Sequence, residues 1–290
     1  MAIIIYTYTN PYKINHEKYW ALIKNAFHLC VSQTLVNGLC DQYREFYNGK
    51  LTTVTRFINN LFDDWESDVI HIKQRAAVDN AIDYMDFNAL ISDDISDSDI
   101  RTSLKRNRGY VVDSLRIMFE LGMNPQNIRT SALTYEQKCV VGIFRELLAN
   151  KAFEIKKEFT KEEIDDAIDK TIKDSIKKNN VDTANINKNT IIVHGVHQFT
   201  PIMLRMIEVL SRYKNVILLF NYQPDYKNAY QTWVNVYSWF ESKVNFSNQN
   251  FNNESTESEG GIIAGNMAAM IAGSTAAVNL SNKVEVTEFD

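Results

Sequence analysis

Several features that mark particular protein classes are scarce or missing in this chain. Its 290 residues include four prolines and three widely spaced cysteines, Cys30, Cys40 and Cys139. Such spacing forms neither a disulfide framework nor the ligand pattern of a zinc site. The formal charge is 31 − 36 = −5, so the chain lacks an overall basic character. Any nucleic-acid contact would therefore have to be local.

Signals that direct a chain to a membrane are also weak. The first residues, MAIIIYTYT, have no basic segment and only a short apolar run, which is unlike a signal peptide. The one candidate span, Gly261 to Leu280, owes its hydrophobicity mostly to alanine and is interrupted by polar residues such as Asn266. We interpret it as a helix docked on the domain. We expect a protein of the reducing cytoplasm with no membrane partner.

The most informative pattern runs from Ile191 to Tyr222. A β-branched run, Ile191 to Val193, is typical of a strand that is buried on both faces. Thr200 and Pro201 then supply a hydroxyl N-cap and a proline at the first helical position. A second apolar run, Val216 to Phe220, follows the predicted helix. Strand, helix and strand with tight connections predict a βαβ unit with a right-handed crossover.

The rest of the chain predicts an α/β fold with a parallel, Rossmann-like or RecA-like sheet and a large helical insertion. Strands are expected over residues 2–9 and 27–31, and helices over 16–26, 53–65, 69–87 and 135–159. Thr160 and Glu163 form a capping box before an isoleucine stripe that begins at Ile164. We assign residues 1–90 and 186–290 to the sheet domain, with a mobile loop at 247–259, and residues 91–185 to the insertion.

Such a sheet invites a test for nucleotide binding, and the required motifs are missing. A phosphate-binding loop would follow the first strand as GxxxxGK[ST], but no glycine occurs before Gly38. The carboxylates that hold Mg²⁺ and polarise water would end the strand at 191–193. His194 and Gly195 stand there instead. We therefore expect no catalytic residues, no cofactor, and neither ATP nor magnesium.

Two residue clusters each leave two interpretations open. His194 and His197 are either half of a metal site or a hydrogen-bonded histidine beside a loop histidine, because no cysteine or carboxylate lies close enough to complete a metal site. Arg101, Lys105 and Arg108 would share one face of a helix. That face either contacts phosphate or is neutralised by the adjacent acidic segment SDDISDSD.

These residues resemble a known family. The segment HGVHQFTPIMLRMIEVL (194–210) is similar to the degenerate Walker B region of the B subunit in AddAB/RexAB-type helicase–nucleases. CVSQTLVNGL (30–39) and LTTVTRFINNL (51–61) resemble segments that follow strands in superfamily 1, UvrD-like helicase domains, and NVILLFNY resembles their motif III strand. The resemblance implies the N-terminal helicase-like half of an AddB/RexB-type subunit that has lost its phosphate loop.

The resemblance also implies a single-stranded DNA track. By position, it would include Ser32, Gln33, Thr34, Thr52 and Thr53. His194 and Gly195 would occupy the degenerate Walker B position.

Three functions remain open. The first is a helicase-like, ATPase-inactive domain of a DNA repair, recombination or phage-defence system, which binds DNA or scaffolds an active helicase or nuclease subunit. The second is a protein-interaction module that binds no nucleic acid. The third is an ATP-dependent DNA helicase with an atypical site.

Overall fold

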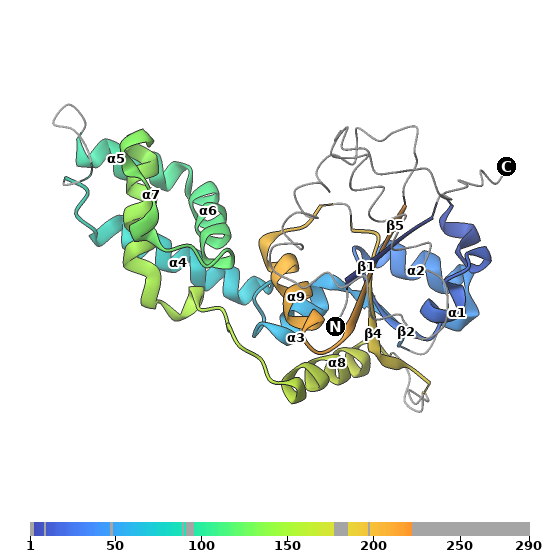
Figure 1. Ribbon diagram of the computed structural model, residues 1–290. Coiled ribbons are helices and arrows are strands. Elements are labelled where there is room, and N and C mark those ends of the chain that lie inside the picture. The colour runs from blue at the N-terminus through green and yellow to red at the C-terminus, as the bar shows by residue number, and fades with distance from the viewer. Residues whose placement is uncertain are drawn as a thin grey trace, which may run out of the picture. The chain divides into compact units, whose positions relative to one another are not determined.

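The computed structural model describes residues 3–8, 10–46, 49–88, 90, 96–176, 185–196 and 198–221 (Figure 1). The chain forms two compact units. Unit 1 comprises Met1–Leu61 and Phe159–Asp290, and unit 2 comprises Phe62–Glu158.

Unit 1 contains a five-stranded sheet in which every described pairing is parallel. Its strands are β1 (Ile3–Tyr8), β2 (Ala26–Cys30), β3 (Leu51–Thr53), β4 (Asn187–His194) and β5 (Asn215–Asn221), in the order β1-β5-β4-β2-β3. The central strands are almost wholly buried, which explains their runs of β-branched and aliphatic residues. The predicted parallel α/β fold is confirmed.

The βαβ unit predicted near residue 200 is also confirmed. β4 leads into α9 (Pro201–Ser211) and then into the parallel strand β5. The Thr200 hydroxyl accepts a hydrogen bond from the Met203 amide, and Pro201 occupies the first turn, where its missing N–H costs nothing. These two residues set the start of the helix at the end of the loop that follows β4.

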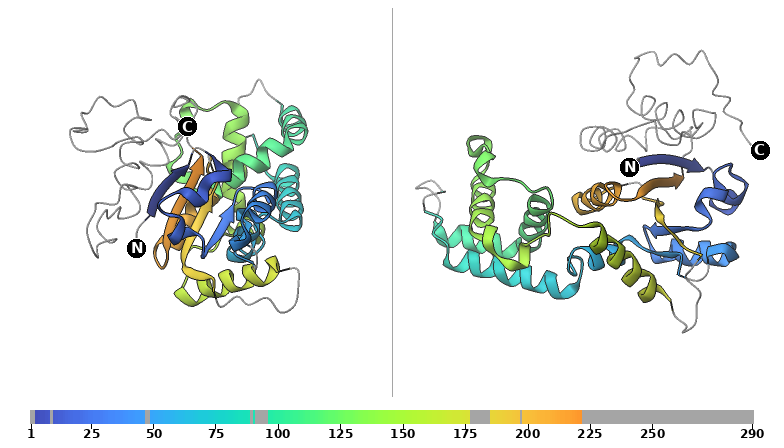
Figure 2. Two further views of the ribbon diagram at one scale, coloured as in Figure 1. Left: turned by 90° about the vertical axis from the view of Figure 1, so that its right-hand side faces the viewer. Right: turned by 60° about the horizontal axis from the view of Figure 1, so that its bottom comes forward.

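Helices cover both faces of the sheet (Figures 1 and 2). One face carries α1 (Trp20–Ile23) and α2 (Gln33–Gln42), with the 3₁₀ turns η1 (Pro11–His16) and η2 (Arg44–Phe46). Ile23, Val36 and Leu39 pack there with Ile192 and Ile217 of the sheet. The other face carries α9, α3 (Val54–Leu61) and α8 (Lys161–Ser175), and α3 packs against both of its neighbours. The sheet is therefore the middle of three layers.

Unit 2 is helical. Its elements are α4 (Asp68–Tyr84), α5 (Asp97–Arg106), α6 (Arg108–Glu120) and α7 (Tyr135–Glu146), with 3₁₀ turns η3 (Pro125–Asn127), η4 (Thr130–Ala132), η5 (Leu147–Ala149) and η6 (Lys151–Phe153). The buried Arg116 guanidinium lies over the Trp65 ring and donates to Glu66 and Gln74. The Trp65 indole N–H donates to Glu120, so this buried charge is paired and hydrogen-bonded.

The boundaries of the two units differ from the expected ones at 90/91 and 185/186. α4, expected in the sheet domain, belongs to unit 2, because Val78 and Ile82 lie on its buried face and it packs on α6 and α7. α8, expected in the insertion, belongs to unit 1. Its capping box is present as predicted, and Ile164, Ile168 and Ile172 are buried on the side of the helix that packs on α3.

Three expected helices are shorter than predicted. The helix expected over 16–26 is only the four-residue α1, which follows the end of η1 at His16. The helix expected over 53–65 is α3, which ends at Leu61. The helix expected over 135–159 ends at Glu146, and Asn150 then caps η6 by accepting from the Ala152 amide. Local side-chain capping competes with continued helix at this point.

Some predictions fall outside the described residues. They are His197, Tyr222, the loop at 247–259 and the segment Gly261 to Leu280. Within the described part of the chain, no helix has both the length and the apolar character needed to cross a membrane.

Candidate site at the switch point of the sheet

The strand order identifies one place where a parallel sheet offers a ligand site. From β2 the chain moves outward to β3, and from β4 it moves in the opposite direction to β5. β2 and β4 are neighbours, with Cys30 opposite His194 at their carboxyl ends. Ligands of open α/β sheets bind at such a switch point, beyond the carboxyl ends of the strands. We therefore define the switch-point edge by the residues that follow β2, β3 and β4.

Helices begin at this edge with hydroxyl caps. The Ser32 hydroxyl accepts from the Leu35 amide at 3.2 Å, and the Thr53 hydroxyl accepts from the Arg56 amide at 3.3 Å. The first amides of α2 and α3 have no carbonyl partner within their helices, so each end carries a partial positive charge. Two adjacent strands thus present helix N-termini that suit an anion such as phosphate.

Of the five residues predicted to follow a DNA track, four reach the surface of this edge. Ser32, Gln33 and Thr34 are exposed, and Thr53 is half-buried. The prediction for Thr52 is contradicted, because only 2% of this residue is exposed and its side chain cannot contact DNA. It lies inside β3, a strand that the sequence did not reveal.

Gly195 has a backbone role at the end of β4. Its φ is +77°, in the left-handed region that favours glycine. A Cβ atom here would lie 2.6 Å from Cδ2 at the flexible end of the Leu35 side chain, which would have to shift. The Gly195 amide donates to the Leu219 carbonyl at 2.7 Å. Turn geometry and close packing therefore account for glycine at this position.

His194 is fully buried and lies inside the core beneath the edge. Its Nε2 lies 3.1 Å from the Tyr8 hydroxyl, and its ring lies 5.8 Å from that of His28. Burial, opposed by a hydrogen bond to the Ile23 carbonyl, lowers the pKa of His28 to about 4. Burial and then the neighbouring His28 lower the pKa of His194 well below its ordinary value. Both rings are therefore neutral at pH 7.

Of the two interpretations of His194, the structure favours the hydrogen-bonded histidine. No group of three histidine, cysteine or acidic side chains in the described part of the chain is arranged to hold a metal ion. The second histidine of the pair, His197, lies outside that part.

The residues around β1 and β4 do not fit a magnesium–nucleotide site of the phosphate-loop type. After β1 the chain enters η1, where the Asn10 side chain accepts from the Tyr12 amide at 2.8 Å. This turn contains no glycine and is closed by its own hydrogen bond, so its amides do not surround a phosphate group. At the end of β4, His194 is turned inward and already bonded to Tyr8.

The predicted basic face lies in unit 2 and is neutralised. Arg101 pairs with Asp97 at 2.5 Å and also donates to backbone carbonyls at the end of α4. Lys105 pairs with Asp83, and Arg108 pairs with Asp79 at 2.8 Å. Asp97 belongs to the acidic segment recognised in the sequence, whereas the other two acids come from α4. The pairing favours the neutralised face over a free phosphate contact.

The sequence reasoning missed a cation at the switch-point edge. Arg56 is exposed in the first turn of α3, next to the Thr53 cap, and forms no ion pair with any described residue. The sequence did contain a signal for this cation, because Thr53 and Arg56 have the spacing of a helix N-cap and the third residue of the helix. It could be interpreted only once the short strand β3 was known to end at Thr53.

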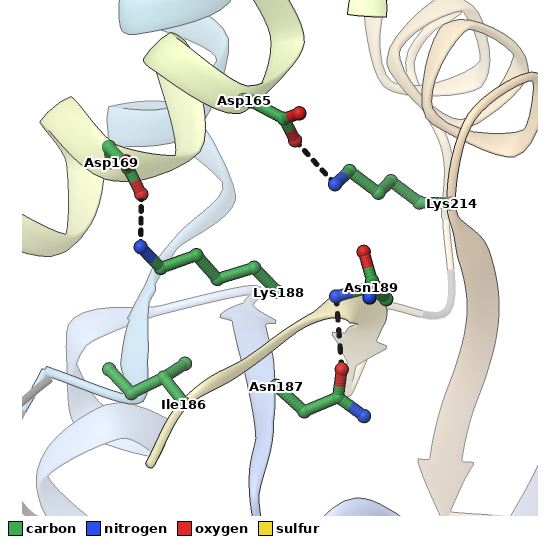
Figure 3. Close-up of a pocket in the computed structure, with 7 residues that line it drawn as sticks. All are labelled: Asp165, Asp169, Ile186, Asn187, Lys188, Asn189 and Lys214. Atoms are coloured by element: carbon green, nitrogen blue, oxygen red, sulfur yellow. Dashed lines mark hydrogen bonds and ion pairs between the residues drawn. The ribbon is translucent and has the colours of Figure 1, made fainter. Parts of the chain in front are cut away.

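A polar hollow of about 560 Å³ lies at the opposite edge of the sheet (Figure 3). Lys214, only 2% exposed, pairs with Asp165 at 2.5 Å, and Lys188 pairs with Asp169 at 2.6 Å. Burial raises the pKa of Asp165, but hydrogen bonds from Lys214 and Lys161 outweigh this and lower it overall. Each lysine charge is matched by an aspartate of α8. These two ion pairs therefore hold α8 against the sheet. Neither lysine of the hollow is left unpaired to bind a charged ligand.

Comparison with models of known protein families, with curated proteins and with solved structures gave no match.

Proposed function

We propose that this chain is a helicase-like, ATPase-inactive domain of a cytoplasmic DNA repair, recombination or phage-defence helicase–nuclease system. In this proposal it resembles the N-terminal half of an AddB/RexB-type subunit. It binds single-stranded DNA at the switch-point edge and scaffolds an active helicase or nuclease partner. The observation that carries the DNA proposal is that two hydroxyl-capped helix N-termini meet at this edge beside Arg56, whose cation forms no ion pair with the described part of the chain.

The chemistry of the edge agrees with backbone contact and with little sequence preference. Amides at helix N-termini and a single arginine bind phosphate oxygens, which every nucleotide carries. Ser32, Gln33 and Thr34 add exposed polar side chains that can hydrogen-bond to phosphate or sugar. The proposed loss of ATPase activity is supported by His194, a fully buried histidine at the position where an active site of this type would carry a carboxylate.

Fluorescence anisotropy with a labelled oligothymidylate tests the DNA proposal. Binding is expected to weaken as salt rises, because each neutralised phosphate releases a counterion. Arg56→Ala should weaken binding about five- to tenfold and reduce the salt slope by about 1. Lys173→Ala, which removes a surface cation from the last turn of α8, is the matched control and should bind like the parent. Absent or salt-insensitive binding would refute the DNA proposal.

The neutralised face of unit 2 gives a second comparison. Lys105→Ala should leave DNA affinity unchanged, because its charge is already matched by Asp83. If Lys105→Ala weakened DNA binding as much as Arg56→Ala does, the basic face would instead be part of the proposed DNA track.

One observation favours the second candidate, a protein-interaction module without nucleic acid. The cations predicted to contact phosphate, Arg101, Lys105 and Arg108, are all paired with acids. Recovery of a nuclease or ATPase in a pull-down, with no shift of DNA mobility, would support that candidate. Calorimetry with Mg-ATP addresses the third candidate, and binding heat would revive an atypical ATP site.

A further inference from the structure

One apolar side chain is exposed at the switch-point edge. Val31, the first residue after β2, is 43% exposed. In the described part of unit 1, the one other exposed large hydrophobic residue is Tyr12. Tyr12 follows β1, which is not a neighbour of β2 or β4 in the sheet. Isolated exposed hydrophobic residues are ordinary on protein surfaces, so exposure alone assigns no role to Val31.

Val31 is fixed at the junction of β2 and β4. Its amide donates to the His194 carbonyl at 3.0 Å, which extends the pairing of these strands one residue beyond Cys30. A Cβ atom on Gly195 would lie 3.5 Å from Val31 Cγ1 and 2.6 Å from Leu35 Cδ2. Both side chains therefore lie against the place where Gly195 lacks a side chain. We call these three residues, Val31, Leu35 and Gly195, the junction patch.

Groups that suit a phosphate lie directly beside the junction patch. Ser32 follows Val31 in the chain, and its hydroxyl accepts from the amide of Leu35, so the patch and the α2 cap share this hydrogen bond. Gln33 and Thr34 are exposed in the same turn. A nucleotide combines a charged phosphate with the apolar face of a base, whereas inorganic phosphate would gain nothing from an exposed valine. The combination of apolar patch and capped helix therefore matches a nucleotide better than a simple anion.

We propose that the junction patch contacts a base of single-stranded DNA whose phosphate lies at the N-terminus of α2. This inference rests on the proposed function and adds the part of the ligand that carries the base. Every base has a ring face, so contact with Val31 and Leu35 requires no particular sequence. In a duplex those faces are stacked on neighbouring base pairs, so the ligand class is nucleic acid with unpaired bases.

Fluorescence anisotropy with two labelled oligonucleotides of equal length tests the proposal, one an oligothymidylate and one built of abasic sugar–phosphate units. Both carry the same phosphates, so phosphate contacts cancel in the ratio of their Kd values. The parent should bind the oligothymidylate about three- to fivefold more tightly, since the base covers part of one valine and its neighbour. Val31→Thr keeps the shape of the side chain but replaces a methyl group by a hydroxyl. It should weaken binding of the oligothymidylate alone and reduce the ratio to below about twofold.

Three further variants separate the base contact from other effects. Val69→Thr makes the same change at an exposed valine of α4 in unit 2 and should leave both Kd values unchanged. Arg56→Ala should weaken both oligonucleotides by the same factor, because it removes a phosphate contact. Val31→Leu keeps an apolar side chain and should keep the preference for oligothymidylate. Circular dichroism checks the folding of every variant.

The outcomes distinguish this inference from the proposed function. If the parent binds both oligonucleotides equally, or if Val31→Thr keeps the full preference, the base contact is overturned while DNA binding stands. If neither oligonucleotide binds, the proposed DNA binding fails, and the base contact fails with it.

Discussion

The buried histidines make unit 1 sensitive to acid, and His28 gives the clearest measurement. His28 is fully buried in β2, and its Nε2 lies 2.8 Å from the Ile23 carbonyl. The neutral ring donates this bond, whereas a protonated ring would place an uncompensated charge in the core. His28→Gln removes the titration and keeps an amide N–H that can donate to the same carbonyl.

The size of the effect follows from the pKa of His28. Burial lowers it from about 6.5 in the unfolded chain to about 4 in the folded one. Between these values the unfolded state binds more protons, so the free energy of unfolding rises with pH in this window. The contribution of His28 is complete above about pH 6.5. Linkage predicts a loss of about 2 kcal/mol at pH 5 and about 3 kcal/mol once pH falls below 4.

Urea titrations at pH 7 and at pH 5 measure the free energy of unfolding. Hydrogen exchange in peptides from β2 and β4 follows the unfolding of unit 1 separately from that of unit 2. The parent should lose about 2 kcal/mol more stability than His28→Gln between the two pH values. Carboxylates that titrate in the same range cancel in this comparison. His16→Gln, at an exposed histidine of η1, should behave like the parent. Equal losses in the parent and His28→Gln would refute this account of the buried ring.

Three further predictions concern stability. Gly195→Ala should cost about 1–2 kcal/mol in urea unfolding, because alanine is strained at a φ of +77° and its Cβ would meet Leu35. Asp165→Asn should lower the Tm more than the double change with Lys214→Met, because the single change leaves a buried lysine without its carboxylate. Thr160→Ala should cost about 1 kcal/mol by circular dichroism, because it removes the hydroxyl of the α8 capping box.

Features encoded by neighbouring residues were predictable from the sequence. Thr200 and Pro201 define the start of α9 without reference to the rest of the fold, and Thr160 does the same for α8. The apolar run around Ile191 likewise identifies a buried strand, because burial on both faces removes the polar alternation of an exposed strand. Local hydrogen bonds and periodicity are sufficient in each case.

Features that join distant residues were not predictable. β3 is three residues long, too short to show a strand pattern, and its position beside β2 depends on the order of the sheet. The pair between Arg108 and Asp79 joins residues 29 positions apart on different helices. Until α4 was placed against α5 and α6, Arg108 had no known partner. The sequence therefore allowed two interpretations of this face, one in which it contacts phosphate and one in which acids neutralise it, and could not decide between them.

His194 shows one feature that could be predicted from neighbouring residues and one that depends on a distant residue. Its position at the end of a predicted strand was clear from the sequence, but the direction of its side chain was not. The fold turns it inward to Tyr8, 186 residues away, in a core that keeps the ring neutral. An aspartate in its place would be a buried charge with little more than the Tyr8 hydroxyl to compensate it. A single substitution therefore cannot build a magnesium site at this edge. The core beneath the edge holds a neutral residue, and the phosphate contacts proposed at this edge are the Ser32 and Thr53 caps and Arg56.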